Sequence, residues 1–362
     1  MTRQIVSHVP DYLPWPRGEG LQALHYVLAT VNAAQTLEGA DAFDTVDVER
    51  LFSTVAMLAE RRTHEASPFV SWDPAIEHLD RADPPRSKEV EDALAEALLG
   101  SANNLSGALT NFIDSRLERG NGRLFRQVQI AMTRALRQLL RVDNQADVRY
   151  LAPIVEHSRS GPVLTVATLN YDQTIETMAR SLGVPCDTGI ESWSRTGQWS
   201  PPAAGVSLLK LHGSIDWVFE SAGPILPART VRVVEDPSNE VSRDPAIVFG
   251  ERNKLTAVGP FLELLAGFQA ALRNANQLII VGYSFRDDHI NETVRRWING
   301  MESRTLVVID PSFPVVIGSF DAPSFKSELV GRLPQPHRLR VIPKNAREGL
   351  AELLTTDRPA SD

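Results

Sequence analysis

Three short segments carry polar residues whose types and spacing could do chemistry: residues 168–172, 210–217 and 282–288. Each segment follows an apolar run that is typical of a buried strand. Because polar residues at the carboxyl ends of parallel strands gather in one crevice, we expect the three segments to form one ligand site. The spacing predicts a nucleotide pocket, and the residue types favour chemistry on a ribose.

His212 is the residue of these segments best suited to proton transfer. It follows the strand-like segment 208–211, Leu-Leu-Lys-Leu, and precedes Gly213. Imidazole is the side chain that gains and loses a proton near neutral pH. At a strand end it can accept a proton from a bound hydroxyl, and Gly213 lets a ligand approach the backbone. The alternative is a histidine hydrogen-bonded beneath a loop. Asp216 either orients His212 or begins a turn.

Asn170 and Asp172 lie where the strand predicted at 163–168 gives way to a helix. An amide and a carboxylate at this place can hold the carboxamide or the hydroxyls of a ligand. The alternative is local: Asp172 caps the helix and Asn170 is a turn residue. Both interpretations stay open on the residues alone.

Gly282 and Ser284 end the most apolar strand and precede a helix, whose free N–H groups and positive dipole end suit a phosphate. Asp287 is equally suited to cap that helix. Asp310 follows the strand at 305–309 and resembles the acidic residue that binds an adenosine ribose in doubly wound folds. Its alternative role is that of a turn residue.

Metal chemistry is not predicted. The histidines, cysteine and carboxylates show no metal-ligand spacing along the sequence, and His289 is expected on a helix surface. The single cysteine, Cys186, excludes a disulfide framework and a four-cysteine zinc site.

Strands and helices alternate in the second part of the chain, which predicts a parallel sheet covered on both faces. Strands are expected at 163–168, 206–211, 246–249, 277–283, 305–309 and 339–342. Helices are expected at 172–182, 261–274, 288–298 and 347–354. Residues 221–243 are expected to leave the sheet as a flap. The predicted fold class is α/β, with a Rossmann-like doubly wound parallel sheet.

The first 150 residues form a large N-terminal helical region in this interpretation. Helices are expected at 21–31, 47–59, 89–99, 105–117 and 124–140, and a loop at 63–87. The predicted domains are therefore 1–150, helical, and 151–362, Rossmann-like.

Composition narrows the class of protein. The 362 residues carry a net charge of −8, which argues against direct binding of nucleic acid over the whole surface. Arginines between residues 116 and 141 recur at helical spacing and predict a solvated or partner-facing surface. No apolar stretch reaches the ~20 residues that span a bilayer, and the N-terminus lacks a signal peptide. A cytoplasmic protein is predicted.

The motifs together resemble the sirtuin family, specifically the bacterial sirtuin-like proteins that cleave NAD. The resemblance covers residues 160–345 and rests on four matches in order: Thr168, Asn170 and Asp172 for Thr-x-Asn-x-Asp; His212 and Gly213 for His-Gly; Gly282 and Ser284 for Gly-x-Ser; and Asp310. It departs from the family in two respects. The zinc cysteines of deacetylases are missing, and so is the Gly-Ala-Gly-x-Ser loop that holds the pyrophosphate of NAD. Two explanations for the missing loop stay open: the loop lies upstream of the given start of the sequence, or the protein has lost it.

The resemblance implies an NAD hydrolase that releases nicotinamide and ADP-ribose, with NAD as substrate and no metal. It makes His212 the general base, while Asn170 positions water and ribose and Asp172 holds the carboxamide. It also places these residues in the NAD-binding set: Thr168, Gly213, Gly282, Ser284, Asp287 and Asp310.

The resemblance further implies a role in anti-phage defence, in which NAD depletion stops growth. Such an activity needs a gate, which we expect from a homo-oligomer or from a genomic-neighbour protein such as a HerA-type ATPase or an Argonaute-like protein. The alternative is a catalytically silent nucleotide-binding or assembly subunit of the same fold.

Overall fold

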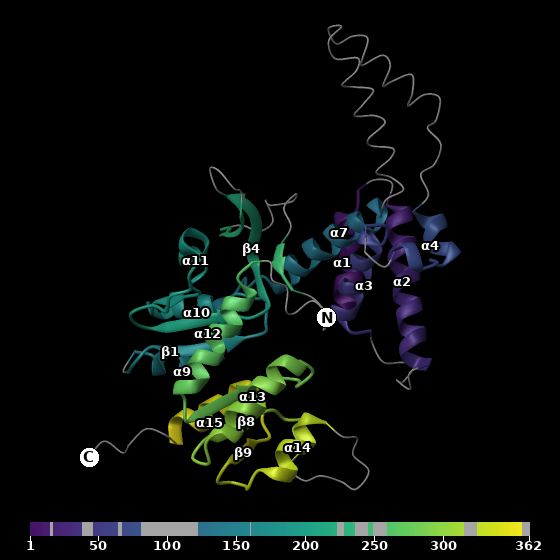
Figure 1. The fold of residues 1–362 in the computed structure, drawn as a ribbon. Helices are drawn as coiled ribbons and strands as arrows, with labels where there is room; N and C mark the ends of the chain where they lie inside the picture. The colour runs from purple at the N-terminus through teal and green to yellow at the C-terminus, as the bar shows by residue number, and fades with distance from the viewer. Residues whose placement is uncertain are drawn as a thin grey trace, which may run out of the picture. The chain divides into compact units, whose positions relative to one another are not determined.

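The computed structural model describes residues 1–14, 17–37, 46–63, 67–80, 122–159, 161–222, 228–235, 245–248, 259–314 and 324–356. It divides into two compact units, Met1–Leu139 and Leu140–Asp362 (Figure 1). The predicted functional domains, 1–150 and 151–362, stay a prediction. No helix among the described residues is long and apolar enough to cross a membrane.

The first unit is helical in its described residues. Its elements are α1 (Thr2–Tyr12), α2 (Gly18–Leu37), α3 (Val48–Glu60), η1 (Ser67–Phe69), α4 (Pro74–Leu79) and α7 (Arg123–Leu140), which ends at the border of the second unit. The expected helices at 21–31, 47–59 and 124–140 are confirmed as α2, α3 and α7. The helices expected at 89–99 and 105–117 lie outside the described residues.

The loop predicted at 63–87 was wrong where α4 lies. Asp73 caps this helix, since its Oδ1 accepts a hydrogen bond from the backbone N–H of Ala75 at 2.8 Å. Pro74 occupies the first helical position, where the missing N–H costs no helical hydrogen bond. The proline that indicated a loop therefore begins a helix.

The predicted arginine surface is confirmed only in part. Arg126 of α7 and Arg141, which follows the helix, are exposed, whereas Arg137 is buried in the helical unit. Arg116 and Arg119 lie outside the described residues.

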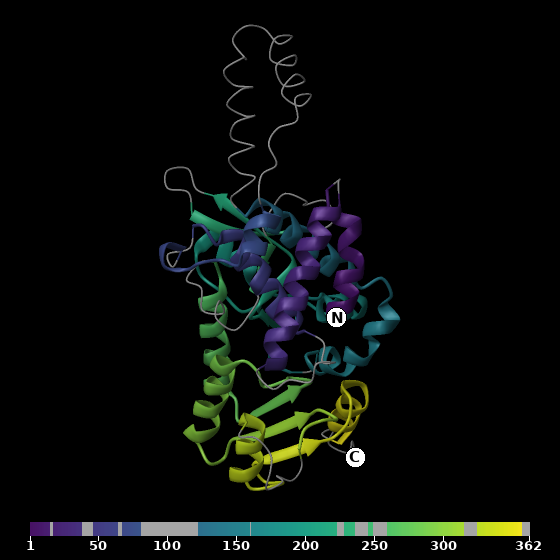
Figure 2. The same cartoon turned by 90° about the vertical axis from the view of Figure 1, so that its right-hand side faces the viewer.

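Two parallel three-stranded sheets form the framework of the second unit. The first has the order β1 (Leu164–Thr168), β3 (Val206–Lys210), β2 (Cys186–Asp187). The other has the order β7 (Gln277–Val281), β8 (Thr305–Ile309), β9 (Leu339–Ile342), which Figure 2 shows as neighbouring arrows coloured green to yellow. The unit is thus a mixed α/β structure with parallel sheets.

A third sheet is antiparallel and was not predicted. Its order is β5 (Ala228–Val233), β4 (Gly213–Ala222), β6 (Pro245–Ile247). The segment 246–249 was therefore wrongly assigned to a parallel sheet. The flap expected at 221–243 is, in its described residues, the end of β4, strand β5 and two residues that follow it.

Residues from helices pack on both faces of strand β8. In β8, Leu306 and Val308 pack in one apolar cluster, with residues of α12 (Phe261–Asn274), α13 (Asp288–Gly300) and α14 (Phe325–Arg332). The alternate residues, Val307 and Ile309, pack in another, with α9 (Ala152–His157), α10 (Thr174–Leu182) and α15 (Ala346–Thr356). This alternation is what strands buried on two faces require.

The helices expected at 172–182, 261–274, 288–298 and 347–354 are confirmed as α10, α12, α13 and α15. Three short elements complete the unit: α8 (Gln145–Val148), η4 (Arg149–Leu151) and α11 (Ile190–Thr196).

Candidate active site at the ends of the parallel strands

The parallel register aligns the strand ends that carry the candidate residues. Thr168 at the end of β1 lies opposite Lys210 at the end of β3, and Val281 at the end of β7 lies opposite Ile309 at the end of β8. Each of the three predicted segments therefore starts at the carboxyl edge of its sheet, as expected for an α/β ligand site.

Hydrogen bonds tie the loop after β1 to the segment around His212. The backbone N–H of Leu211 donates to the carbonyl of Thr168 at 3.0 Å, and that of Ile215 to the carbonyl of Tyr171 at 2.9 Å. The Tyr171 hydroxyl donates to the carbonyl of Val248 at 3.1 Å. These bonds bring the Tyr171 and His212 rings to a centroid distance of 6.3 Å. Tyr171 is a site residue that the sequence motif contained but did not single out.

Asn170 is exposed at the tip of this loop. Its backbone N–H donates to the Thr168 hydroxyl at 3.1 Å, so Thr168 shapes the turn. The structure thus gives Thr168 a local role and presents the Asn170 side chain toward solvent.

Asp172 has the helix-capping contact that its alternative role requires. Its Oδ1 accepts hydrogen bonds from the backbone N–H of Thr174 at 3.0 Å and from the Thr174 hydroxyl at 2.7 Å. The helix begins at Thr174, two residues after the start of the predicted range 172–182, and the cap residue is Gln173 instead of Asp172. Both bonds use the same carboxylate oxygen, so capping and ligand binding are compatible.

A buried ion pair, Lys210–Glu176, stabilises the loop after β1. The Lys210 ammonium donates to the carbonyl of Asp172 and to Glu176 Oε1, the latter at 2.8 Å. Burial raises the pKa of Glu176, and the Lys210 charge opposes that rise without cancelling it. Burial, aided by the charge of Glu176, also raises the pKa of the Cys186 thiol to about 12, so the thiol is protonated and unreactive at neutral pH.

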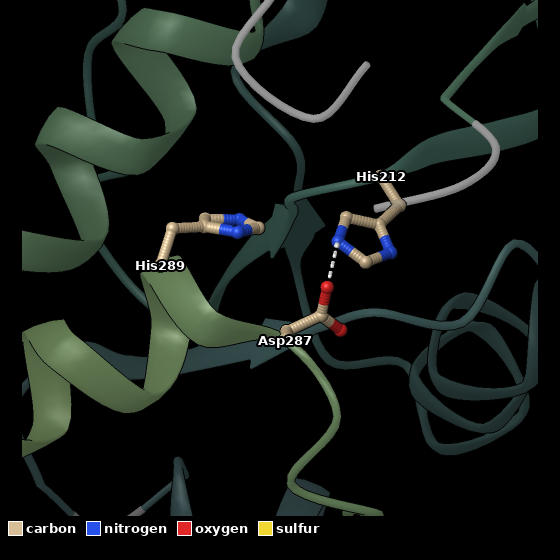
Figure 3. Close-up of side chains that lie close together, drawn as sticks. All are labelled: His212, Asp287 and His289. Atoms are coloured by element: carbon tan, nitrogen blue, oxygen red, sulfur yellow. Dashed lines mark ion pairs between the residues drawn. The ribbon is translucent and has the colours of Figure 1, made fainter. Parts of the chain in front are cut away.

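His212 lies at the centre of the site and is only 2% exposed. Its Nε2 lies 3.9 Å from Asp287 Oδ1, and its ring centroid lies 6.3 Å from that of His289 (Figure 3). Asp216 has a different contact: its Oδ2 accepts a hydrogen bond from Gln173 Nε2 at 2.8 Å. The carboxylate that the structure places beside His212 is therefore Asp287.

Gly213 is held by the chain itself. Its φ is +86°, and a Cβ there would lie 2.0 Å from the carbonyl oxygen of Ala246 in β6. Glycine is thus required for the close approach of β6, whereas the prediction that a ligand approaches this backbone stays a prediction.

The loop between β7 and α13 directs Asp287 inward. Asp287 occupies the cap position of α13, yet its side chain makes no capping hydrogen bond, and it is 6% exposed. The predicted capping role of this carboxylate is therefore wrong.

The same loop is fixed by its own contacts. Phe285 has a φ of +62°, which is strained for a bulky residue, and its carbonyl accepts a hydrogen bond from Asn291 Nδ2 at 2.9 Å. The Tyr283 hydroxyl donates to Asn291 Oδ1 at 3.0 Å, and burial, together with the charge of Asp287, raises the pKa of Tyr283.

The predicted phosphate contacts lie on the outside of this loop. Gly282 and Ser284 are exposed, and a Cβ at Gly282 would meet no atom within 4 Å. The loop that carries both residues leads into the N-terminus of α13, and a helix N-terminus suits a phosphate group.

Asp310 lies at the end of β8 with both carboxylate oxygens engaged. Oδ1 accepts from the backbone N–H and the hydroxyl of Ser312, both at 2.8 Å, and Oδ2 pairs with Lys326 Nζ at 3.1 Å. Although burial opposes the shift, these bonds lower the pKa of Asp310. Lys326 also lies over the Phe285 ring, 5.6 Å from its centroid, which links Asp310 to the Asp287 loop.

Three potential metal ligands converge at the site. His212, Asp287 and His289 each offer one ligand atom, and these atoms lie within 4.8 Å of one another. His289 is half-buried and faces His212 (Figure 3), so the expected helix-surface position was wrong. The sequence spacing showed no such group because His212 lies far from the other two residues along the chain.

Residues 164–329 match a SIR2-like domain. The match begins with β1 and ends within α14, so the SIR2-like domain includes every candidate site residue from Thr168 to Asp310. It supports a sirtuin-like family and an NAD-related function for this part of the chain, since SIR2-like domains use NAD. No curated protein matches the chain.

Proposed function

We propose that the SIR2-like domain hydrolyses NAD to nicotinamide and ADP-ribose. The observation that carries the proposal is the placement of buried His212 beside Asp287, at 3.9 Å, on the strand edge that also bears the Asn170 loop. In the reaction, water adds to the ribose carbon, the nicotinamide–ribose bond breaks, and one proton is released.

His212 acts as the general base in this proposal. It accepts a proton from a ribose hydroxyl as positive charge develops on the sugar ring. The Asp287 carboxylate stabilises the positive charge that His212 then carries, and it helps to orient the imidazole. Asp287 is a positioning residue because it acts through His212.

The loop after β1 supplies the contacts to the reacting half of NAD. Asn170 is exposed at the loop tip, where its amide can position the attacking water and the ribose. Asp172 presents its carboxylate from the loop that Lys210 holds, and a ligand carboxamide can donate to it.

The other half of the nucleotide is assigned to the late strands. The open space at Gly282 and Ser284, beside the N-terminus of α13, receives a phosphate group. Asp310 receives the adenosine ribose. Since a carboxylate accepts about four hydrogen bonds, the contacts with Ser312 and Lys326 leave capacity for a hydroxyl.

We further propose that the activity serves anti-phage defence by depleting NAD. Such a reaction harms the cell unless it is gated, so we assign the gate to self-assembly or to a genomic-neighbour protein such as a HerA-type ATPase or an Argonaute-like protein. The helical region at 1–150 is the proposed contact surface.

A silent nucleotide-binding subunit is the second candidate function. Two observations favour it: the Ala246 carbonyl already occupies the space beside Gly213, and Asp310 is already paired with Lys326. Both contacts leave less room for a nucleotide beside Gly213 and Asp310.

One experiment separates the two functions. The purified protein, alone and with its genomic-neighbour protein, is incubated with NAD, and nicotinamide release is followed by chromatography while NAD binding is measured by calorimetry. Release of nicotinamide supports the hydrolase. Binding without release under every condition supports the silent subunit and overturns the hydrolase.

A further inference from the structure

The convergence of His212, Asp287 and His289 exceeds what proton transfer requires. A general base needs one imidazole and, at most, one carboxylate to orient it. Here a second imidazole faces the same space, and the three ligand atoms lie within 4.8 Å of one another (Figure 3). His289 therefore calls for an explanation of its own.

The donor types are those of a transition-metal site. Two imidazole nitrogens and one carboxylate oxygen are borderline donors that suit zinc, and three protein ligands with one open position are typical of exchangeable zinc sites. Harder ions such as Mg²⁺ and Ca²⁺ prefer sites built from oxygen atoms alone. Two of the three side chains, His212 and Asp287, are also largely shielded from water.

The geometry is close to what zinc needs. With bonds of about 2.0–2.2 Å, a tetrahedral zinc ion holds its ligand atoms about 3.3–3.6 Å apart. His212 Nε2 and Asp287 Oδ1 are already at 3.9 Å. The other separations between ligand atoms are at most 4.8 Å, so the side chains must turn toward a common centre to complete the site.

The backbone that carries the ligands is well fixed. Asp287 and His289 begin α13, and the loop before them is held by the Asn291 bond to the Phe285 carbonyl. His212 is fixed through its carbonyl, which accepts a hydrogen bond from the N–H of Val248 at 3.0 Å. Preorganised ligands of this kind lower the cost of binding an ion.

We propose that His212, Asp287 and His289 bind one divalent zinc ion. A bound zinc ion uses the lone pair of the His212 ring nitrogen that faces Asp287. On the basis of the proposed NAD hydrolysis, zinc then inhibits the reaction, because it takes the Asp287 carboxylate and its positive charge disfavours a further proton on the His212 ring.

The binding test uses the full chain without a histidine tag, freed of metal with a chelator. Zinc is titrated by calorimetry and in competition with a zinc indicator dye. We expect one zinc ion per chain, and His289→Ala weakens binding by at least about tenfold, since even outer-shell contacts are worth that much. Asp287→Asn gives a second, independent reduction.

The matched control is His337→Ala, because His337 is an exposed histidine outside the group. Its zinc affinity equals that of the wild type, and circular dichroism shows that each variant is folded. Equal zinc affinities for wild type, His289→Ala and Asp287→Asn overturn the metal site.

The activity measurement is separate. Zinc binding that depends on His289 supports the site even in a protein that releases no nicotinamide, so a failure of the hydrolase leaves it standing. If the wild type cleaves NAD, we expect added zinc to inhibit the reaction in proportion to the occupied site. Cleavage that saturating zinc leaves unchanged overturns the inhibition.

Discussion

Two buried pairs of ionisable side chains, one in each unit, differ in how closely their atoms approach. In the helical unit, Arg61 Nη2 and Asp80 Oδ2 lie 2.6 Å apart, with side chains 0% and 1% exposed. In the α/β unit, His212 Nε2 and Asp287 Oδ1 lie 3.9 Å apart, with side chains 3% and 8% exposed. Burial is similar, but only the first pair is at hydrogen-bond distance.

The surroundings of the two carboxylates differ in the same way. Asp80 also accepts from the backbone N–H groups of Gly122 at 2.8 Å and Leu124 at 3.3 Å, so it joins α3, α4 and the start of α7. Asp287 occupies a helix cap but does not use its side chain for capping. A buried carboxylate that accepts several hydrogen bonds from its neighbours stabilises a fold. A carboxylate 3.9 Å from an imidazole can instead assist proton transfer or bind an ion together with that imidazole.

The largest effect is expected from His212→Asn, which removes the proposed base. Nicotinamide release falls by about 10²–10⁴-fold, the usual contribution of general base catalysis. Urea unfolding checks that the variant is folded, and His337→Ala keeps the wild-type rate. A wild-type rate in a folded His212→Asn protein would show that the His212–Asp287 pair serves the fold, as Arg61–Asp80 does, and not catalysis.

Asp80→Asn is expected to have its effect on stability. The Arg61 charge stays buried without its close counter-charge, which costs about 3 kcal/mol in the free energy of unfolding of the helical unit. Chemical denaturation measures the loss, and Asp11→Asn, at an exposed aspartate of α1, is the control with a change below about 0.5 kcal/mol. If Asp80→Asn loses no more unfolding free energy than Asp11→Asn, the Arg61–Asp80 pair does not stabilise the helical unit.

Asp287→Asn tests whether the spacing of 3.9 Å serves catalysis. Because Asp287 acts through His212, kcat falls by roughly 10-fold to 100-fold while KM for NAD stays near its wild-type value. Steady-state kinetics measures both constants, and Asp288→Asn, at the exposed neighbour, is the matched control. A large rise in KM with unchanged kcat would instead make Asp287 a substrate-binding residue.

The sequence predicted five of the six parallel strands because each of the five is an apolar run, whereas the two-residue strand β2, Cys186–Asp187, was missed. Residues 305–309 and the helix at 261–274 were located to the residue. Strand β4 was missed because its partners β5 and β6 are set by long-range antiparallel pairing, which local periodicity does not carry. Helix α11 was missed because it is one short segment between two glycines.

The site was harder to predict than the fold. The motif order placed His212 correctly at a strand end, but the role of Asp287 depends on which way its side chain turns, and a cap residue can turn either way. The contact between His212 and His289 is a product of tertiary packing. Sequence spacing detects ligands on one helix or one turn, not ligands that two distant segments bring together.

The Lys210–Glu176 pair combines features of the two pairs compared above. It lies in the α/β unit, as His212–Asp287 does, but its atoms are 2.8 Å apart, within hydrogen-bond distance like those of Arg61–Asp80. Burial raises the native pKa of Glu176 above its ordinary value despite Lys210. Between the ordinary and the raised value the native state therefore binds more protons than the unfolded state, and stability falls as the pH rises. Glu176→Gln removes this dependence, whose slope is at most about 1.4 kcal/mol per pH unit.

Urea unfolding of wild type and Glu176→Gln across roughly pH 4 to 8 measures that slope. Protonated Glu176 and glutamine are both neutral, so a constant offset between the two proteins carries no information on the charge, and the decisive quantity is the change of the difference with pH. Glu263→Gln, at an exposed glutamate of α12, keeps the wild-type profile. Parallel curves for wild type and Glu176→Gln would contradict the raised pKa. A wild-type stability that falls with rising pH relative to that of Glu176→Gln would show that even a pair at contact distance carries a desolvation cost, so that distance alone does not make a buried pair stabilising.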